Sequence, residues 1–313
     1  MTDRLAGAPP DRRVLVTGAS GFIGRNALPA LRRRGFDVHA VSFSARAESA
    51  DASWHVADLL DARARSQLMD SVQPTHLLHL AWYAEPGAFW TSPLNVPWLQ
   101  ASLELVRLFA AAGGQRLVGA GTCAEYEWAG NGVCREGETP LAPSTLYGEC
   151  KRSLGAVTER LYAAPDMPSS AWGRIFFLYG PHEPPQRLVP SVARALIQGH
   201  EAPCTDGRQQ RDFMHCSDVG EAFAALLDCD VEGAVNIASG AAVSIAEVVS
   251  LVGEACGRPE LVRLGALPPR PGDPAVLVAD TSRLRDEVGF TSERSLPEGI
   301  AETVAWWREQ ISP

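Results

Sequence analysis

The stretch from Val14 to Gly24, with the sequence VLVTGASGFIG, constrains the fold more than any other part of the chain. An apolar, β-branched run leads into Gly18, Gly21 and Gly24, and a helical pattern follows. Glycines at such positions let the backbone turn tightly, approach phosphate groups and pack a helix close to a strand, while the helix N-terminus offers free N–H donors. Three glycines also mark ordinary turns, but the strand before and the helix after favour a dinucleotide-binding loop.

Composition narrows the class of protein. A chain of 313 residues with 46% hydrophobic content can bury the core of one large nucleotide domain and a smaller partner. A net charge of −9 argues against nucleic acid or an anionic membrane as partner, since both need a basic surface. The chain shows neither a long apolar run nor the apolar core of a secretory signal near its start, so we expect a cytoplasmic protein. Seven scattered cysteines without metal-ligand spacing predict reduced thiols and no bound metal.

The order of patterns along the chain predicts an α/β fold, a doubly wound parallel sheet of the Rossmann type with a smaller C-terminal substrate lobe. Residues 1–180 plus about 211–238 are assigned to the dinucleotide-binding domain, and residues 181–210 plus 239–313 to the substrate lobe. The expected strands are Val14–Thr17, Val38–Phe43, His76–Leu80, Leu117–Ala120 and Ser170–Phe176.

The end of the second expected strand indicates which dinucleotide binds. An acid at this point normally bonds the ribose hydroxyls of NAD and repels a 2′-phosphate. This chain has Ser42 there, followed by Ser44 and Arg46, which favours NADP(H), with NAD(H) as the alternative if the three are plain loop residues. Asp58, after the next strand, is expected to contact the adenine.

Tyr147 and Lys151 are four residues apart in a segment that reads as helical, so they share one helix face. An ammonium beside a phenol lowers the phenol's pKa, which makes the tyrosine usable as an acid or base near neutral pH. Thr122 ends a preceding strand, and its hydroxyl would bond the reacting oxygen. Together with the glycine loop, these three residues predict a catalytic set.

These motifs resemble those of the extended short-chain dehydrogenase/reductases of the nucleotide-sugar epimerase/dehydratase family, over nearly the whole chain. The matching stretches are TGASGFIG, HLAW around Ala81, Thr122 placed 25 residues before Tyr147, YGECK, and RIFFLYGP from Arg174. The resemblance implies a nucleoside-diphosphate sugar as substrate. It also implies cofactor contacts from Gly18, Gly21, Phe22, Ile23, Gly24, Ser42, Ser44, Arg46, Asp58, Leu59, Leu80, Ala81, Tyr147 and Lys151.

The second half of the resemblance concerns the sugar nucleotide. Arg211, in RDFMHCSDV, and Arg270, in RPGDP, inherit the role of clamping the diphosphate, for which a guanidinium is well suited, with a surface ion pair as the alternative. Phe177 replaces the family's usual Asn in RxxNxYG. The aromatic segment AWYAEPGAFWTSP either walls the sugar pocket or plugs it. The expected substrate-binding residues are Trp82, Glu85, Cys123, Glu125, Phe177, Arg187, Arg211 and Arg270.

Departures from the family pattern narrow the chemistry. The 4,6-dehydratases carry an Asp and a Glu after the catalytic threonine, whereas this chain has Cys123 and Ala124, so dehydration lacks a proton carrier. Ketoreduction needs only NADPH, an acidic tyrosine and a hydroxyl that orients the carbonyl. We therefore expect reduction of a keto group, at C4 of a nucleoside-diphosphate 4-keto-6-deoxyhexose, with Tyr147 donating the proton.

Three alternatives stay open from the sequence. An NAD-dependent C4 epimerase is the nearest. A 3,5-epimerase/reductase would use His182, which lies where such enzymes place a catalytic histidine. A dinucleotide sensor without chemistry is the third, although it would not need the proton-donor set. The resemblance also implies a homodimer built on a four-helix interface.

Overall fold

A seven-stranded parallel sheet forms the centre of the larger part of the molecule. The computed structural model describes residues 12–44, 50–128, 132–269 and 272–311. The strand order is β11-β7-β5-β4-β1-β2-β3, and every neighbouring pair is parallel. The order reverses between β1 and β4, the point at which sheets of this type bind ligands. The strands are β1 (Arg13–Thr17), β2 (Asp37–Ser42), β3 (Ser53–Val56), β4 (His76–His79), β5 (Arg116–Thr122), β7 (Ser169–Ile175) and β11 (Gly233–Ile237). The predicted doubly wound sheet is confirmed.

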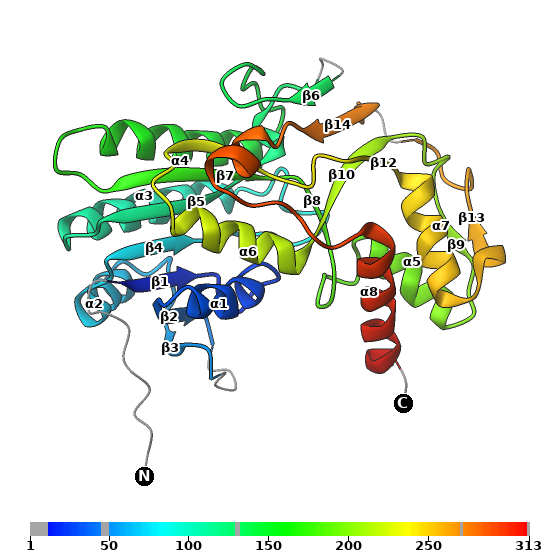
Figure 1. Ribbon diagram of the computed structural model, residues 1–313, viewed down its shortest axis with the longest axis horizontal. Coiled ribbons are helices and arrows are strands. Elements are labelled where there is room, and N and C mark those ends of the chain that lie inside the picture. Colours follow the sequence, from blue (N-terminus) through cyan, green and yellow to red (C-terminus); the bar gives the residue numbers. More distant parts are fainter. Residues whose placement is uncertain (1–11, 45–49, 129–131, 270–271, 312–313) are drawn as a thin grey trace, which may run out of the picture.

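Helices cover both faces of this sheet. Helices α1 (Gly24–Arg33) and α6 (Cys216–Leu227) lie on one face, and α3 (Asn95–Ala111) and α4 (Leu146–Tyr162) on the other (Figure 1). Helix α2 (Ala62–Val72) shares the buried cluster of α3 and α4. Strand β1 serves both layers because successive side chains point to opposite faces: Val14 packs with α1 and α6, and Leu15 with the opposite cluster.

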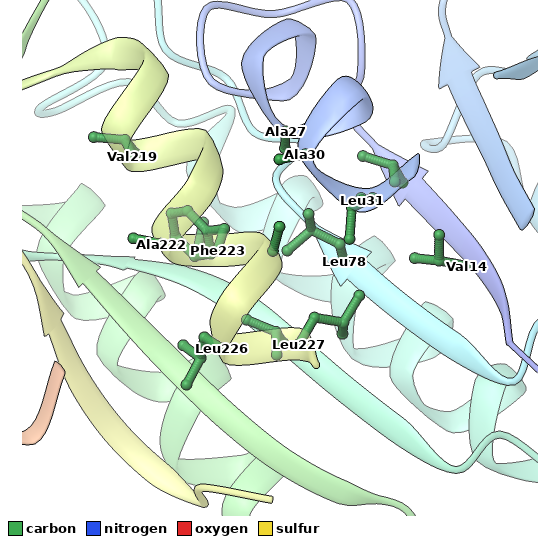
Figure 2. Close-up of a cluster of buried hydrophobic side chains, with 14 of the residues drawn as sticks. Val14, Ala27, Ala30, Leu31, Leu78, Val219, Ala222, Phe223, Leu226 and Leu227 are labelled. Carbon is green, nitrogen blue, oxygen red and sulfur yellow. The ribbon is translucent and has the colours of Figure 1, made fainter. Parts of the chain in front are cut away.

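The contact between α1 and α6 fixes one side of the glycine loop. Ala27, Leu31, Phe223 and Leu227 interlock between the two helices and the sheet (Figure 2). The helices approach closely because a Cβ at Gly220 would lie 2.5 Å from the backbone of Asn26, so only glycine fits there.

The C-terminal part forms a second body beside the sheet (Figure 1). Its five-stranded sheet has the order β12-β10-β14-β6, with β8 paired to β10. Helices α5 (Leu188–Ile197), α7 (Ile245–Cys256) and α8 (Leu296–Ile311) bury a core of their own. The remaining elements are β6 (Gly132–Cys134), η1 (Cys123–Glu125), β8 (Phe177–Tyr179), β9 (Ala202–Pro203), β10 (Gln210–His215), β12 (Ala242–Ser244), η2 (Pro259–Leu261), β13 (Val262–Arg263), β14 (Val276–Ala279) and η3 (Arg283–Glu287).

The chain passes between the two sheets several times, first at β6, which lies in the smaller sheet and falls, along the chain, between β5 and β7 of the larger one. It leaves the large sheet after β7, forms β8 in the smaller sheet, and returns to the large sheet only at β11. Strand β10 belongs to the smaller sheet, although α6, which follows it directly, covers the larger one. Among the described residues, no helix is both long enough and apolar enough to cross a membrane.

Candidate active site

The glycine loop lies at the reversal of strand order, directly after β1 and beside the residues that follow β4. Gly18 has φ of +67°, and a Cβ there would lie 2.7 Å from the backbone nitrogen of Ala81. A Cβ at Gly24 would lie 2.3 Å from the carbonyl oxygen of Gly18. Helix α1 then begins without a side-chain cap from any described residue and without an acid in its first turn, so its positive end is not neutralised locally. This cradle fits a dinucleotide pyrophosphate.

The edge where the adenosine end of a dinucleotide would lie is formed by the ends of β2 and β3. The Ser42 hydroxyl is buried and donates to the carbonyl oxygen of Ser44 at 2.6 Å, which closes the turn after β2. Asp58 is exposed, and its carboxylate accepts from the Leu60 N–H at 2.9 Å, while Leu59 is buried. Arg46 lies outside the described residues, so the positive charge expected at this edge is not placed.

Thr122 and Tyr147 meet where β5 ends and α4 begins. The Thr122 hydroxyl accepts from the Ala124 N–H at 3.2 Å and caps η1, and Thr145 caps α4 by accepting from the Gly148 N–H at 3.1 Å. Burial raises the pKa of Tyr147, while its hydrogen bond with Thr122 and the charge of Arg187 act in the opposite direction. The phenol is therefore protonated at neutral pH, and the lowering of its pKa expected from Lys151 is not found.

Lys151, the only lysine in the sequence, lies one helical turn further along α4. Only 3% of its surface is exposed. Its Nζ donates to the carbonyl oxygen of Ala120 at 2.8 Å and lies 4.1 Å above the ring of Trp82. Burial lowers the pKa of Lys151 to about 7, against the opposing charge of Glu125. The amine therefore changes charge near neutral pH, unlike an ordinary lysine.

The aromatic segment after β4 packs around Tyr147. The rings of Phe89 and Trp90 meet the phenol edge-on, with centroids 4.8 Å and 5.8 Å away, and the Trp90 carbonyl oxygen accepts from the Tyr147 N–H at 3.1 Å. Trp128 contacts Trp90 in turn. Glu85 is exposed on the same segment. The segment thus borders the proposed catalytic tyrosine directly.

Asn95 is a site residue that the sequence reasoning missed. It is fully buried at the start of α3, where its side-chain oxygen accepts from the Trp82 indole N–H at 2.8 Å. Its amide nitrogen donates to the carbonyl oxygens of Phe89 and Ser92 at 2.7 Å and 2.9 Å. A polar residue directly after an aromatic segment, at the head of an apolar helix, was the available signal.

The structure places the expected substrate residue Glu125 inside the protein, bound to neighbouring elements. Its side chain is buried. One carboxylate oxygen accepts from the Thr122 N–H and the Trp172 indole N–H, both at 2.9 Å, and the other accepts from Nε of Arg174 at 2.8 Å. Glu125 thus ties η1 to β7 and is not available to a ligand.

The other expected substrate residues differ in their accessibility. Arg211 is buried, pairs with Asp273 at 2.5 Å and lies over the Phe177 ring. Arg187 is exposed and lies over Phe89, which places it beside Tyr147. Cys123 is buried, and burial raises the pKa of its thiol. Arg270 lies outside the described residues.

The expected catalytic role of His182 is not supported by its position. Its backbone has φ of +69°, and its ring lies 4.5 Å from that of Trp306 on α8. It borders a cavity of about 380 Å³ together with Arg25, His215 and other residues from α1, α6 and α8. None of Thr122, Tyr147 and Lys151 borders this cavity.

The fold and the site together define a dinucleotide-dependent enzyme of the extended short-chain dehydrogenase/reductase type. The model of the NAD dependent epimerase/dehydratase family matches residues 14–238, so the chain belongs to that family. The resemblance seen in the sequence motifs is confirmed.

Curated relatives span almost the whole chain. A UDP-glucose 4-epimerase of Bacillus subtilis is 24% identical, over 96% of this chain and 98% of its own length. A dTDP-glucose 4,6-dehydratase of Xanthomonas campestris is 27% identical, over 94% of this chain and 92% of its own length. The relatives therefore include enzymes named for two different reactions.

Solved structures agree with the fold throughout. MoeE5 in complex with UDP-glucuronic acid and NAD is 31% identical, with a TM-score of 0.82 over 96% of this chain and 100% of its own. The UDP-glucose 4-epimerase of Thermus thermophilus in complex with NAD is 26% identical, with a TM-score of 0.83 and the same coverage. Both neighbours hold NAD.

Proposed function

We propose that this protein reduces a keto group, at C4 of a nucleoside-diphosphate 4-keto-6-deoxyhexose, with NADPH. The observation that carries the proposal is the protonated phenol of Tyr147 beside Thr122, with Lys151 on the next turn. The positions after Thr122 hold a buried thiol and Ala124, and the next carboxylate, Glu125, is fully engaged. This set donates one proton but offers no carboxylate for water elimination.

Each of the three residues would have its own role at the carbonyl group of the substrate. The Thr122 hydroxyl donates a hydrogen bond to the carbonyl oxygen, and Tyr147 transfers its proton to that oxygen as the carbon accepts a hydride. The ketone becomes an alcohol, and the phenolate of Tyr147 regains its proton from solvent. As an ammonium, Lys151 stabilises the transient phenolate. The reduced dinucleotide supplies the hydride when bound.

The cofactor would be held by the glycine loop at its pyrophosphate and by Tyr147 and Lys151 at its reacting end. The preference for NADPH rests on Ser42 and Ser44, which stand where an acid would repel a 2′-phosphate. The NAD found in the solved neighbours favours the other cofactor. Both cofactors therefore belong in the test.

The deciding experiment compares NADPH and NADH oxidation over a panel of nucleoside-diphosphate 4-keto-6-deoxy sugars. Tyr147→Phe is expected to lower kcat by about 10³-fold, because it removes the proton donor. Tyr162→Phe is the matched control, since it removes a hydroxyl from the far end of the same helix, where that hydroxyl bonds the Val106 carbonyl oxygen. Oxidation that survives in Tyr147→Phe would contradict the assigned role.

An NAD-dependent C4 epimerase is the second candidate, favoured by the names of several relatives and by NAD in the neighbours. It predicts NAD retained through purification and isomerisation of a sugar nucleotide without net oxidation. Membership of an enzyme family disfavours the dinucleotide sensor. The proposed setting is a cytoplasmic homodimer.

A further inference from the structure

Trp82 connects the buried ammonium of Lys151 to a fixed point of the fold. One face of its ring lies 4.1 Å from the lysine Nζ, and its indole N–H donates to the side-chain oxygen of Asn95 at 2.8 Å. Asn95 cannot rotate freely, because its amide nitrogen also donates to two backbone carbonyls. The plane of the indole is therefore set by the start of α3.

A buried ammonium needs compensation for the water it has lost. Within the described residues, the Lys151 Nζ contacts the Ala120 carbonyl oxygen and the Trp82 ring. Glu125 contributes charge at longer range, but its oxygens bond Arg174, Trp172 and the backbone. The negative face of an indole attracts a cation most strongly when water is excluded.

The geometry points to Trp82, oriented by Asn95, as the positioning residue that holds Lys151 charged and aimed from α4 toward the end of β5. This inference rests on the proposed function for the role of Lys151. Two observations support it: the contact between the Trp82 ring and the Lys151 ammonium, and the hydrogen bonds that hold the Asn95 amide.

A simple hydrophobic plug would not need this arrangement. A plug requires area and shape, whereas here an indole N–H and a buried amide fix the orientation of one ring face against one ammonium. The same segment also reaches Tyr147, whose N–H donates to the Trp90 carbonyl oxygen. The segment from Trp82 to Asn95 thus sets the positions of both residues of the pair.

Two further titratable groups, Glu125 and His79, lie near Lys151 on the elements that pack against it. Glu125 approaches from η1 and is held by Arg174. His79 approaches from β4, and burial lowers its pKa to about 3, so it stays neutral throughout the range in which the lysine titrates. On α4 itself, Tyr147 stays protonated over the same range. A change in the titration of Lys151 can therefore be traced to the ring.

The single lysine allows a direct measurement. Protein made with ¹³Cε-labelled lysine gives one side-chain NMR signal, and its midpoint between pH 5 and 10 reports Lys151 without any substrate. Trp82→Leu keeps the site apolar but removes the ring face, so the charged form loses stabilisation and the midpoint should fall by about 0.5–1 pH unit. Trp82→Phe keeps a ring face, so its titration midpoint should lie between those of the wild-type protein and Trp82→Leu.

Matched variants separate this effect from general damage. Trp98→Leu, at a neighbouring tryptophan whose ring centroid is 6.3 Å from that of Trp82, should leave the midpoint within about 0.2 unit. Asn95→Leu removes the acceptor and the donor without adding a charge, so it should release the indole and lower the midpoint in the same direction as Trp82→Leu. Far-ultraviolet circular dichroism reports folding for each variant, and Trp82→Phe remains informative if Trp82→Leu does not fold.

Two outcomes would overturn the inference: an unchanged midpoint in Trp82→Leu, or one that rises toward the ordinary lysine value, which would make the ring a water barrier only. In activity, kcat/KM of Trp82→Leu should fall about three- to ninefold at pH 8 and about twofold or less at pH 6, because the ammonium is lost first at higher pH. Absence of ketoreduction with a shifted midpoint would refute the proposed function and leave the positioning role standing.

Discussion

At the scale of single residues, the buried ion pair of Glu125 and Arg174 connects η1, which follows Thr122, to β7. The two side chains come from η1 and β7 and meet at 2.8 Å, with 1% and 8% of the side chains exposed. Arg174 also donates to the Tyr126 hydroxyl at 3.1 Å, so its charge sits in a hydrogen-bonded network. Removal of one partner from such a pair leaves an uncompensated buried charge.

Glu125→Gln is expected to destabilise the protein by about 3 kcal/mol. The amide keeps the size and one acceptor of the carboxylate, but Arg174 loses its counter-charge. Urea unfolding followed by tryptophan fluorescence measures the loss. Glu149→Gln, which removes an exposed partner of Arg152, is the control and should cost less than about 0.5 kcal/mol. A Glu125→Gln protein of normal stability with a raised KM for the sugar nucleotide would instead support Glu125 as a substrate residue.

The residues that sequence reasoning placed well depend on local spacing. Tyr147 and Lys151 are four apart, and α4 does contain both. Gly18 and Gly24 follow from one strand, turn and helix. The contacts of Glu125 and His182 could not be predicted, because their partners come from distant segments, Arg174 on β7 and Trp306 on α8. No local pattern reports such contacts.

At the scale of elements, the approach of α4 to β5 decides whether Tyr147 reaches Thr122. A Cβ at Gly148 would lie 2.4 Å from the Ala124 carbonyl oxygen, and one at Gly155 would lie 2.9 Å from the Trp172 ring. Two small residues on one helix face thus let α4 pack against η1 and β7. The YGECK motif needs its glycine for this contact, a reason that the motif alone does not reveal.

Gly148→Ala is expected to lower kcat/KM by about a hundredfold. Alanine favours a helix by up to about 1 kcal/mol over glycine, but here its methyl group would force α4 away from Ala124, and a shift of about 1 Å misaligns the proton donor. Steady-state kinetics and thermal melting measure both effects. Gly132→Ala serves as the control, because a Cβ at Gly132 meets nothing within 4 Å. Equal kinetics for the two variants would show that α4 tolerates the displacement.

At the scale of the whole molecule, the two bodies contribute different residues to the candidate site. The large sheet brings the glycine loop, Thr122 and α4 to the carboxyl ends of its strands, and the smaller body adds Arg211 and Phe177. The fold class was predictable because alternating strands and helices leave few arrangements. The pairing of β6, β8, β10, β12 and β14 into one sheet was not, since these strands come from five separate segments.

The outer faces of α3 and α4 carry apolar side chains that the protein leaves uncovered. Val96 is 44% exposed, Val157 47% and Leu161 39%, and the two helices pack side by side. Because the family resemblance implies a four-helix interface and these two helices expose several apolar side chains, we propose that two copies pair through them.

Val157→Glu should convert this dimer to a monomer, because an isologous interface places the new carboxylate twice in an apolar contact. Sedimentation velocity at micromolar concentration measures the change. Leu264→Glu is the matched control, since Leu264 is equally exposed at 46% but lies outside α3 and α4. A wild-type protein that sediments as a monomer would refute the interface, and a dimer that survives Val157→Glu would place it elsewhere. Helix α4 also carries Tyr147 and Lys151, so a dimer contact on this helix would help to hold the catalytic pair in place. The monomeric Val157→Glu variant should therefore be less active than the dimer.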